Sequence, residues 1–198
     1  MHRDHKAIEV QRIAVIQRGE AALRFLKTAQ VMTPRVEAVL LYTQDEMNSS
    51  VFWAYTNRQL LKGDAHAYED SRAVLEAIHE AQCDSAWLGW GFASEKASFV
   101  SALEVAGITV LAPRPHTLSQ LGDKGRAQSY ADQAGFNLIP SLLIDLSEKV
   151  GQQFPNQALL THLLNQRYEQ AISNDELPPL PWLLKATEGG GGRGIFKW

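Results

Sequence analysis

The amino-acid sequence predicts an α/β protein in which helices alternate with the strands of a parallel sheet. Short apolar runs rich in β-branched residues recur along the first part of the chain. Amphipathic stretches of helical period separate these runs, and glycine or proline marks most of the changes between them. Four strands that alternate with helices within about 110 residues favour a Rossmann-like half-wound sheet.

The first strand is expected at residues 12–16, where an apolar, β-branched run ends at a glycine turn. Residues 20–30 predict a helix, because apolar side chains recur there at helical spacing while Arg24 and Lys27 fall on the polar side. The apolar run at 36–42 predicts the second strand. Strand, glycine turn, helix and strand in this order are typical of a parallel sheet.

The alternation of helix and strand continues to residue 111. The next helix has Val74, Leu75 and Ile78 as its apolar stripe. The helix after it has Ser94 as its expected N-cap and Gly107 just beyond its end. In order, these elements are a helix at 68–82, a strand at 85–88, a helix at 94–106 and a strand at 108–111.

Two domains are expected, residues 1–121 and residues 122–198. The second opens with Asp123, a residue type that caps helices. Its expected elements are a helix at 124–133, an amphipathic helix at 157–172, a proline-rich connector at 174–181 and a strand at 182–186.

The composition excludes several classes of protein. Hydrophobic residues make up 45% of the 198 residues and charged residues 21%, which excludes a disordered chain or a collagen-like repeat. The formal charge of -3 lacks the basic excess of a general nucleic-acid binder. One cysteine, Cys83, allows no intrachain disulfide. No apolar segment is long enough for a signal peptide or a membrane span, so a cytoplasmic protein is expected.

The glycine-rich run at 189–194 is the strongest local signal for chemistry. Without Cβ atoms, its backbone N–H groups can approach phosphate oxygens closely. Lys185 on the preceding strand would place an ammonium group beside it. The run is not a Walker A loop, because no Gly-Lys-Ser/Thr follows. The alternative interpretation of the run is a flexible linker.

Two further segments favour an anion site. Gly89-Trp90-Gly91 lies where a strand passes into a helix, which is where ligands bind in open α/β sheets. Glu95 follows it in the first helical turn. Lys124 lies just inside a helix N-terminus, where a cation is misplaced unless an anion neutralises it. A tight turn with a packed tryptophan, and a solvated lysine, are the alternatives.

Taken in order, five segments resemble the biotin carboxylase family of the ATP-grasp superfamily. They are RIAVIQRGEAALRFL at 12–26, LGWGFASE at 88–95, AGITVLAP at 106–113, LGDK at 121–124 and LLKATEGGGGRG at 183–194. The resemblance implies a Rossmann-like pre-ATP-grasp domain, followed by an incomplete ATP-grasp subdomain with a glycine lid.

The resemblance also implies roles for eight residues, each matching a family motif. The ATP phosphates would be contacted by Lys124, Lys185, Gly191 and Gly192. The active-site mouth near biotin would be lined by Trp90, Gly91 and Glu95. Arg24 matches a residue on the helix that commonly helps to form the carboxylase dimer.

The implied reaction uses ATP, Mg²⁺ and bicarbonate to form carboxyphosphate, whose carbon passes to biotin on a carrier domain. The sequence departs from the family at Gln17, where Asn is usual, and at Trp90, where Tyr is usual. Residues 141–180 form a longer stretch than the family pattern has. The family's metal ligands and catalytic groups match positions later than Trp198, so we expect no catalytic residue here and no activity from these 198 residues alone.

Two other functions fit parts of the pattern. One is a different ATP-grasp ligase, such as a carbamoyl-phosphate synthase or a purine-pathway carboxylase. The Arg-Gly-Glu turn at 18–20 and the segment at 89–95 favour a biotin carboxylase over these. The other is a non-catalytic dimerisation or docking module, in which the helix around Arg24 matters more than the glycines.

Overall fold

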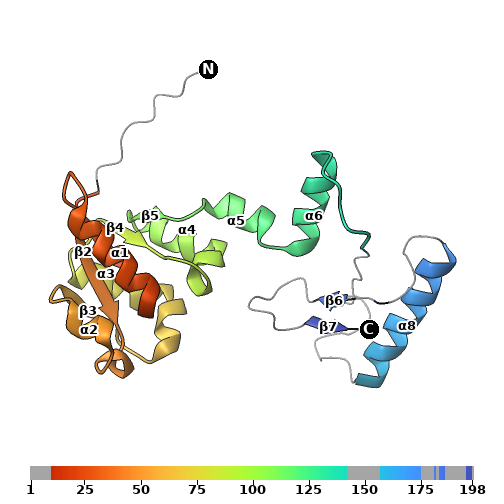
Figure 1. The fold of residues 1–198 in the computed structure, drawn as a ribbon, viewed down its shortest axis with the longest axis horizontal. Helices are drawn as coiled ribbons and strands as arrows, with labels where there is room; N and C mark the ends of the chain where they lie inside the picture. The colour runs from red at the N-terminus through yellow and green to blue at the C-terminus, as the bar shows by residue number, and fades with distance from the viewer. Residues whose placement is uncertain (1–9, 142–156, 175–180, 182, 186–194, 198) are drawn as a thin grey trace, which may run out of the picture. The chain divides into compact units, whose positions relative to one another are not determined.

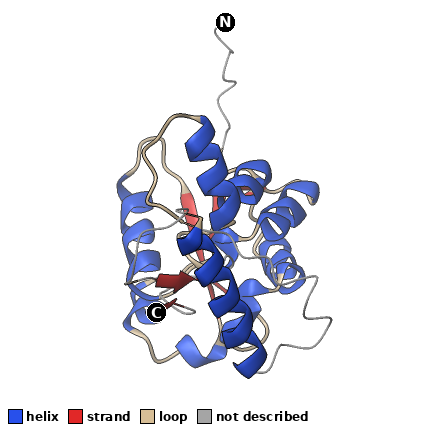
Figure 2. Ribbon diagram, turned by 90° about the vertical axis from the view of Figure 1, so that its right-hand side faces the viewer, coloured by secondary structure: helices blue, strands red, loops and turns tan. Residues whose placement is uncertain are grey.

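The computed structural model describes residues 10–141, 157–174, 181, 183–185 and 195–197 of the chain. The chain separates into two compact units, Met1–Gly122 and Asp123–Trp198. Figure 1 labels the helices and strands, and Figure 2 shows that the strands are short beside the helices.

A parallel five-stranded sheet forms the centre of the first unit, as the sequence predicts (Figure 1). Its order is β3-β2-β1-β4-β5, so the first strand of the chain lies in the middle. In register, Val15 of β1 pairs with Leu40 of β2 on one side and with Trp87 of β4 on the other. The strands are β1 (Arg12–Val15), β2 (Glu37–Tyr42), β3 (Arg58–Leu60), β4 (Ser85–Trp87) and β5 (Thr109–Leu111).

Helices connect the strands of this sheet and cover both of its faces. Asp70 accepts hydrogen bonds from two backbone N–H groups at the start of α3, as an N-cap does. The α-helices are α1 (Gly19–Val31), α2 (Ser50–Ala54), α3 (Ser71–Glu80), α4 (Ala97–Val105) and α5 (Pro115–Leu121). Three short 3₁₀ helices, η1 (Gln44–Glu46), η2 (Ala65–Glu69) and η3 (Phe92–Glu95), follow β2, β3 and β4.

Alternate residues along the strands enter two separate hydrophobic clusters. Ala14 and Ile16 pack in one cluster with residues of α3 and α4, whereas Val15 packs in the other with residues of α1 and α2. Successive side chains of a strand point to opposite faces, so this division places one helix pair on each face of the sheet. The rings of Phe25 and Trp87 stack at 4.3 Å between centroids and tie α1 to β4.

The structure corrects two expectations for the first unit. A fifth strand, β3, was not predicted, because its residues Arg-Gln-Leu have neither the apolar run nor the alternation of a core strand. Ser94 is not the N-cap of α4. It lies inside η3, where its hydroxyl donates to the carbonyl of Gly91 at 2.8 Å, and α4 begins after Lys96.

The second unit contains two described helices and a two-stranded antiparallel sheet. Its described elements are α6 (Lys124–Gln133), α8 (Gln157–Ser173), β6 (Leu183–Lys185) and β7 (Ile195–Lys197). Asp123 caps α6 as expected, by accepting from the N–H of Arg126 at 2.8 Å. Strand β7 was not predicted. Residues 142–156, within the longer stretch at 141–180, and residues 175–180, within the proline-rich connector, lie outside the described residues.

Candidate functional site

The candidate site lies at the carboxyl ends of β1 and β4, where the strand order of the sheet reverses. Strands β2 and β3 extend from β1 in one direction, and β4 and β5 extend in the other. Open α/β sheets bind ligands at such a switch point, because the two loops there diverge to opposite faces. The chain places Gln17 after β1 and the turn Gly89-Trp90-Gly91 after β4.

Gln17 joins these two loops. Its side-chain nitrogen Nε2 donates to the carbonyl of Trp90 at 2.8 Å, and its oxygen Oε1 accepts from the N–H of Arg18 at 2.9 Å. Only 5% of Gln17 is exposed. A buried amide needs such partners, because an unpaired one carries a desolvation cost. The bonds therefore hold the turn after β4 against the loop after β1.

The turn at 89–91 has a backbone that favours glycine on both sides of Trp90. The φ angles of Gly89 and Gly91 are +67° and +68°, in the left-handed region that side chains rarely adopt. The carbonyl of Gly91 accepts from the N–H of Ser94 at 3.0 Å and from its hydroxyl. Trp90 itself is 69% exposed. The turn thus presents an aromatic ring on a hydrogen-bonded backbone.

A charged cluster borders this site after β2. The Arg18 guanidinium contacts Asp45, and its Nε lies 3.2 Å from an oxygen of Glu46. The hydroxyl of Tyr68 donates to Glu46 at 2.6 Å. Burial raises the pKa of Tyr68, and this hydrogen bond raises it further. The hydrogen bond from Thr43 lowers the pKa of Asp45, as does its contact with Arg18. These contacts fix Arg18, and with it the loop that carries Gln17.

The structure brings three of the predicted site residues together. Trp90 and Gly91 form the turn, and the exposed Glu95 ends the 3₁₀ helix that Gly91 begins. The fourth predicted residue of this unit, Arg24, lies on the outer side of α1. Its side chain is 78% exposed and pairs with Glu20 at 3.3 Å.

The predicted phosphate-binding residues belong to the second unit. Lys124 is the first residue of α6, and Lys185 is the last residue of β6; both are exposed. Lys185 pairs with Ile195 of β7, so the two ends of the segment that contains the glycine run lie side by side. Gly191 and Gly192 themselves lie outside the described residues.

Lys124 and Lys185 carry the positive charge that the predicted phosphate contacts require. Two exposed ammonium groups, one of them at a helix N-terminus, suit an anionic ligand. Among the described residues, no group of three or more His, Cys, Asp or Glu side chains is arranged to hold a metal ion. No step through Mg²⁺ is therefore assigned to residues of this part of the chain.

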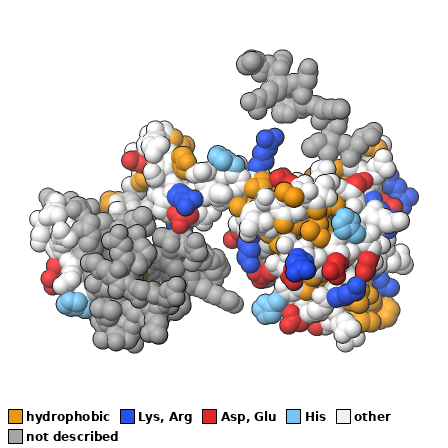
Figure 3. Space-filling model, turned by 180° about the vertical axis from the view of Figure 1, so that it is seen from behind, with side chains coloured by type: hydrophobic (Ala, Val, Ile, Leu, Met, Phe, Trp, Pro, Cys, Tyr) orange, Lys and Arg blue, Asp and Glu red, His pale blue; other side chains and the backbone are white. Residues whose placement is uncertain are grey.

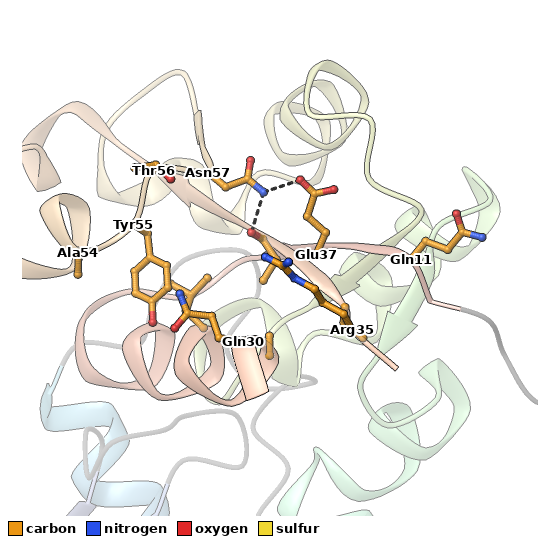
Figure 4. Close-up of a pocket in the computed structure, with 12 residues that line it drawn as sticks. Gln11, Gln30, Arg35, Glu37, Ala54, Tyr55, Thr56 and Asn57 are labelled. Carbon is orange, nitrogen blue, oxygen red and sulfur yellow. Dashed lines mark hydrogen bonds between the residues drawn. The ribbon is translucent and has the colours of Figure 1, made fainter. Parts of the chain in front are cut away.

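A separate groove of about 560 Å³ lies at the other end of the strands, where β1, β2 and β3 begin (Figure 4). It is lined by residues that precede β1, β2 and β3, among them Gln11, Arg35 and Asn57. The amide of Asn57 donates to Glu37 and to the carbonyl of Ala38, both at 3.0 Å. Because these residues lie at the amino ends of the strands, the groove is distinct from the site at the switch point.

The sequence showed Gln17 only as a departure from the family. It did not predict the cluster that Tyr68, Asp45 and Glu46 form around Arg18. The bond from Gln17 to Trp90 spans 73 positions, so local patterns cannot show it. Thr43 and Glu46 form a capping box, and their spacing of three residues could have predicted the start of the short helix η1.

On the face of the first unit in Figure 3, acidic and basic side chains are interspersed, without the basic stripe of a nucleic-acid binder. Among the described helices, none combines the length and apolar character that crossing a membrane requires.

The chain resembles biotin-dependent carboxylases in sequence. Residues 9–118, more than half of the chain, match the family described as biotin carboxylase, N-terminal domain. The biotin carboxylase of Halalkalibacterium halodurans is 26% identical over 93% of the chain, and the pyruvate carboxylase of Bacillus subtilis is 27% identical over 94%. The chain spans 37% of the first relative and 15% of the second.

Solved structures show the same fold. The biotin carboxylase domain of a single-chain bacterial carboxylase is 26% identical, with a TM-score of 0.62 over 80% of this chain and 34% of that one. The biotin carboxylase domain dimer of Hydrogenobacter thermophilus 2-oxoglutarate carboxylase, in complex with MgADP, ADP and bicarbonate, has a TM-score of 0.74. It is 22% identical and covers 96% of this chain and 38% of that one. The sheet of order β3-β2-β1-β4-β5, with the glycine turn at its switch point, lies within the matched residues 9–118 and forms the family's N-terminal domain. The chain therefore belongs to the biotin carboxylase family.

Proposed function

We propose that this chain serves in the ATP-dependent carboxylation of biotin. The first unit supplies the mouth of the biotin site, and the second supplies the first contacts to ATP. The observation that carries the proposal is the hydrogen-bonded Trp90 turn at the switch point of a biotin carboxylase N-terminal domain. Bicarbonate as the carbon source and a biotin carrier domain as the partner follow from the same reaction.

At the biotin mouth, the chain's residues bind and orient. The exposed indole of Trp90 offers a flat apolar surface to a ring system, as aromatic side chains do in ligand sites. Glu95, at the end of the η3 helix that follows the turn, offers an exposed carboxylate. Neither residue forms a covalent bond in this proposal.

At the ATP site, Lys124 and Lys185 are proposed to neutralise phosphate charge, and the glycine run is proposed to cover the phosphates with backbone N–H groups. Phosphoryl transfer depends mainly on such positioned charge. A protein-bound ATP would supply the activated phosphoryl group.

Calorimetric titration of MgATP into the 198-residue chain tests this assignment. Lys185→Ala is expected to weaken binding by roughly ten- to a hundredfold, since a charge-assisted hydrogen bond contributes about 1.5–3 kcal/mol. Lys197→Ala is the matched control, because Lys197 lies at the other end of the same two strands, opposite Leu183. Equal effects of the two substitutions, or no heat with the unaltered chain, would contradict the ATP assignment.

The exposed outer side of α1 supports a second proposal, that a pair of such chains associates through the helix that carries Arg24. The Hydrogenobacter thermophilus structure is itself a dimer of biotin carboxylase domains. Analytical ultracentrifugation tests this association. Arg24→Glu is expected to shift the chain toward monomer, whereas Arg72→Glu, on α3, is expected to leave the distribution unchanged. A monomer at all concentrations would contradict this proposal.

A further inference from the structure

The Trp90 turn needs an external restraint to hold one position. Gly89 and Gly91 flank Trp90, and glycine adopts many backbone conformations at little cost. The Trp90 side chain is largely exposed, so packing of the indole does little to fix the turn. The restraint must therefore come from hydrogen bonds to its backbone carbonyls.

Gln17 supplies this restraint on the Trp90 carbonyl. Its amide bridges two backbone groups, the Trp90 carbonyl and the Arg18 N–H, at 2.8 and 2.9 Å. The Arg18 side chain is held in turn by Asp45 and Glu46, so Gln17 extends from an anchored loop. The bond crosses the switch point from the loop after β1 to the loop after β4.

The Gln17 side chain occupies the space that a side chain at position 89 would need. A Cβ at position 89 would lie 2.6 Å from Nε2 of Gln17 and 3.0 Å from its Cγ. By contrast, a Cβ at position 91 would meet no atom within 4 Å. The Gln17 side chain therefore lies directly against the backbone of the turn, and the absence of a side chain at residue 89 makes this contact possible.

We propose that Gln17 is a positioning residue, which acts through the Trp90 carbonyl to hold the indole where it receives the ring of the substrate. This inference rests on the proposed function for the identity of the ring, which is biotin. The positioning itself concerns only contacts within the first unit.

Gln17→Met tests the positioning, because methionine has a similar length and volume but no amide. The 198-residue chain is labelled with 5-fluorotryptophan, and the Trp90 resonance is assigned from its loss in Trp90→Phe. In Gln17→Met, the Trp90 fluorine resonance is expected to shift or broaden, and the N–H of Ser94, which donates to the carbonyl of Gly91, to exchange with solvent about tenfold faster. The control is Gln59→Met, which removes an amide outside the turn; Gln59 is half-buried on β3 and donates to Glu80 at 2.7 Å.

A titration of free biotin, followed on the same fluorine resonance, connects the positioning to the substrate. Binding by the unaltered chain and about tenfold weaker binding by Gln17→Met support the proposal. An unchanged Trp90 resonance and an unchanged exchange rate in Gln17→Met overturn the positioning proposal, irrespective of the result of the biotin titration. So does equal binding of biotin by both chains. If the unaltered chain binds no biotin while Gln17→Met still loosens the turn, the proposed function fails and the restraint on Trp90 stands without its substrate.

Discussion

Two glycines with nearly equal φ angles differ in what surrounds them. Gly89 and Gly91 have φ angles of +67° and +68°, but only Gly89 faces the Gln17 side chain. Alanine at either position adopts a positive φ, which costs about 1–3 kcal/mol of backbone strain. Only alanine at position 89 also disturbs the contact with Gln17.

Gly89→Ala is expected to lower the free energy of unfolding by about 1–3 kcal/mol more than Gly91→Ala does, because the new Cβ displaces a buried amide from its hydrogen bond. Urea unfolding of both variants measures this difference. A double variant, Gly89→Ala with Gln17→Ala, is expected to recover part of the loss. Equal losses for Gly89→Ala and Gly91→Ala would show that the close approach is unimportant.

Cys83 is a buried thiol, 7% exposed, at the loop before β4. Burial raises its pKa from 9.0 to about 11. In the folded chain the thiol keeps its proton up to about pH 11, whereas in the unfolded chain it begins to ionise near its ordinary value. The stabilisation from the protonated thiol is therefore complete below that ordinary value and is lost as the pH rises through about 11.

Urea unfolding at a series of alkaline pH values tests this effect of Cys83. Stability is expected to fall less steeply with pH in Cys83→Ala than in the unaltered chain, because the variant lacks the titrating thiol. Other groups titrate equally in both proteins, so the difference between the two slopes isolates Cys83. Parallel slopes would contradict the raised pKa.

Among the elements, α3 shows most clearly how a side chain sets a helix boundary. Asp70 precedes the helix, and its carboxylate accepts from the N–H groups of Arg72 and Ala73 at 2.9 and 3.4 Å. Asp70→Ala is expected to lower the free energy of unfolding by about 1 kcal/mol, and Asp70→Asn by much less, since asparagine caps as well as aspartate. Thermal unfolding compares the two variants. Equal destabilisation by both would point to the charge rather than the cap.

The sequence predicts an element well where the pattern is long and buried. The apolar stripe of the third helix was confirmed at Val74 and Ile78, both fully buried. Strand β3 was missed because Arg58, Gln59 and Leu60 are all half-buried at the edge of the sheet, where burial imposes no alternation. Ser94 was assigned wrongly because a cap residue and a residue in a 3₁₀ turn have the same local preference for hydrogen bonds to the backbone.

The candidate site was only partly readable for a similar reason. The glycines around Trp90 lie next to it in the chain, so their spacing shows directly in the sequence. The role of Gln17 depends on a contact between strands that are neighbours only after folding. The joint roles of Lys124 and Lys185 at ATP stay predictions.

At the scale of the whole molecule, the first unit contains its own core. The buried residues of both hydrophobic clusters lie between Ala14 and Ile108. A chain of residues 1–122 is therefore expected to fold alone, since each domain with its own core can do so. Urea unfolding of this shorter chain should be cooperative, and Cys83 should stay unreactive toward thiol reagents at neutral pH. A broad transition or a fully reactive Cys83 would contradict this independence.

The place of β1 in the middle of the sheet has a consequence for synthesis on the ribosome. β1 emerges first and can pair with β2 once Tyr42 has left the exit tunnel, but its other edge must wait for Trp87. At about 5–20 residues per second, this wait lasts roughly 2–9 seconds. During that interval the nascent chain carries an open, apolar strand edge, which another nascent chain or a chaperone can occupy.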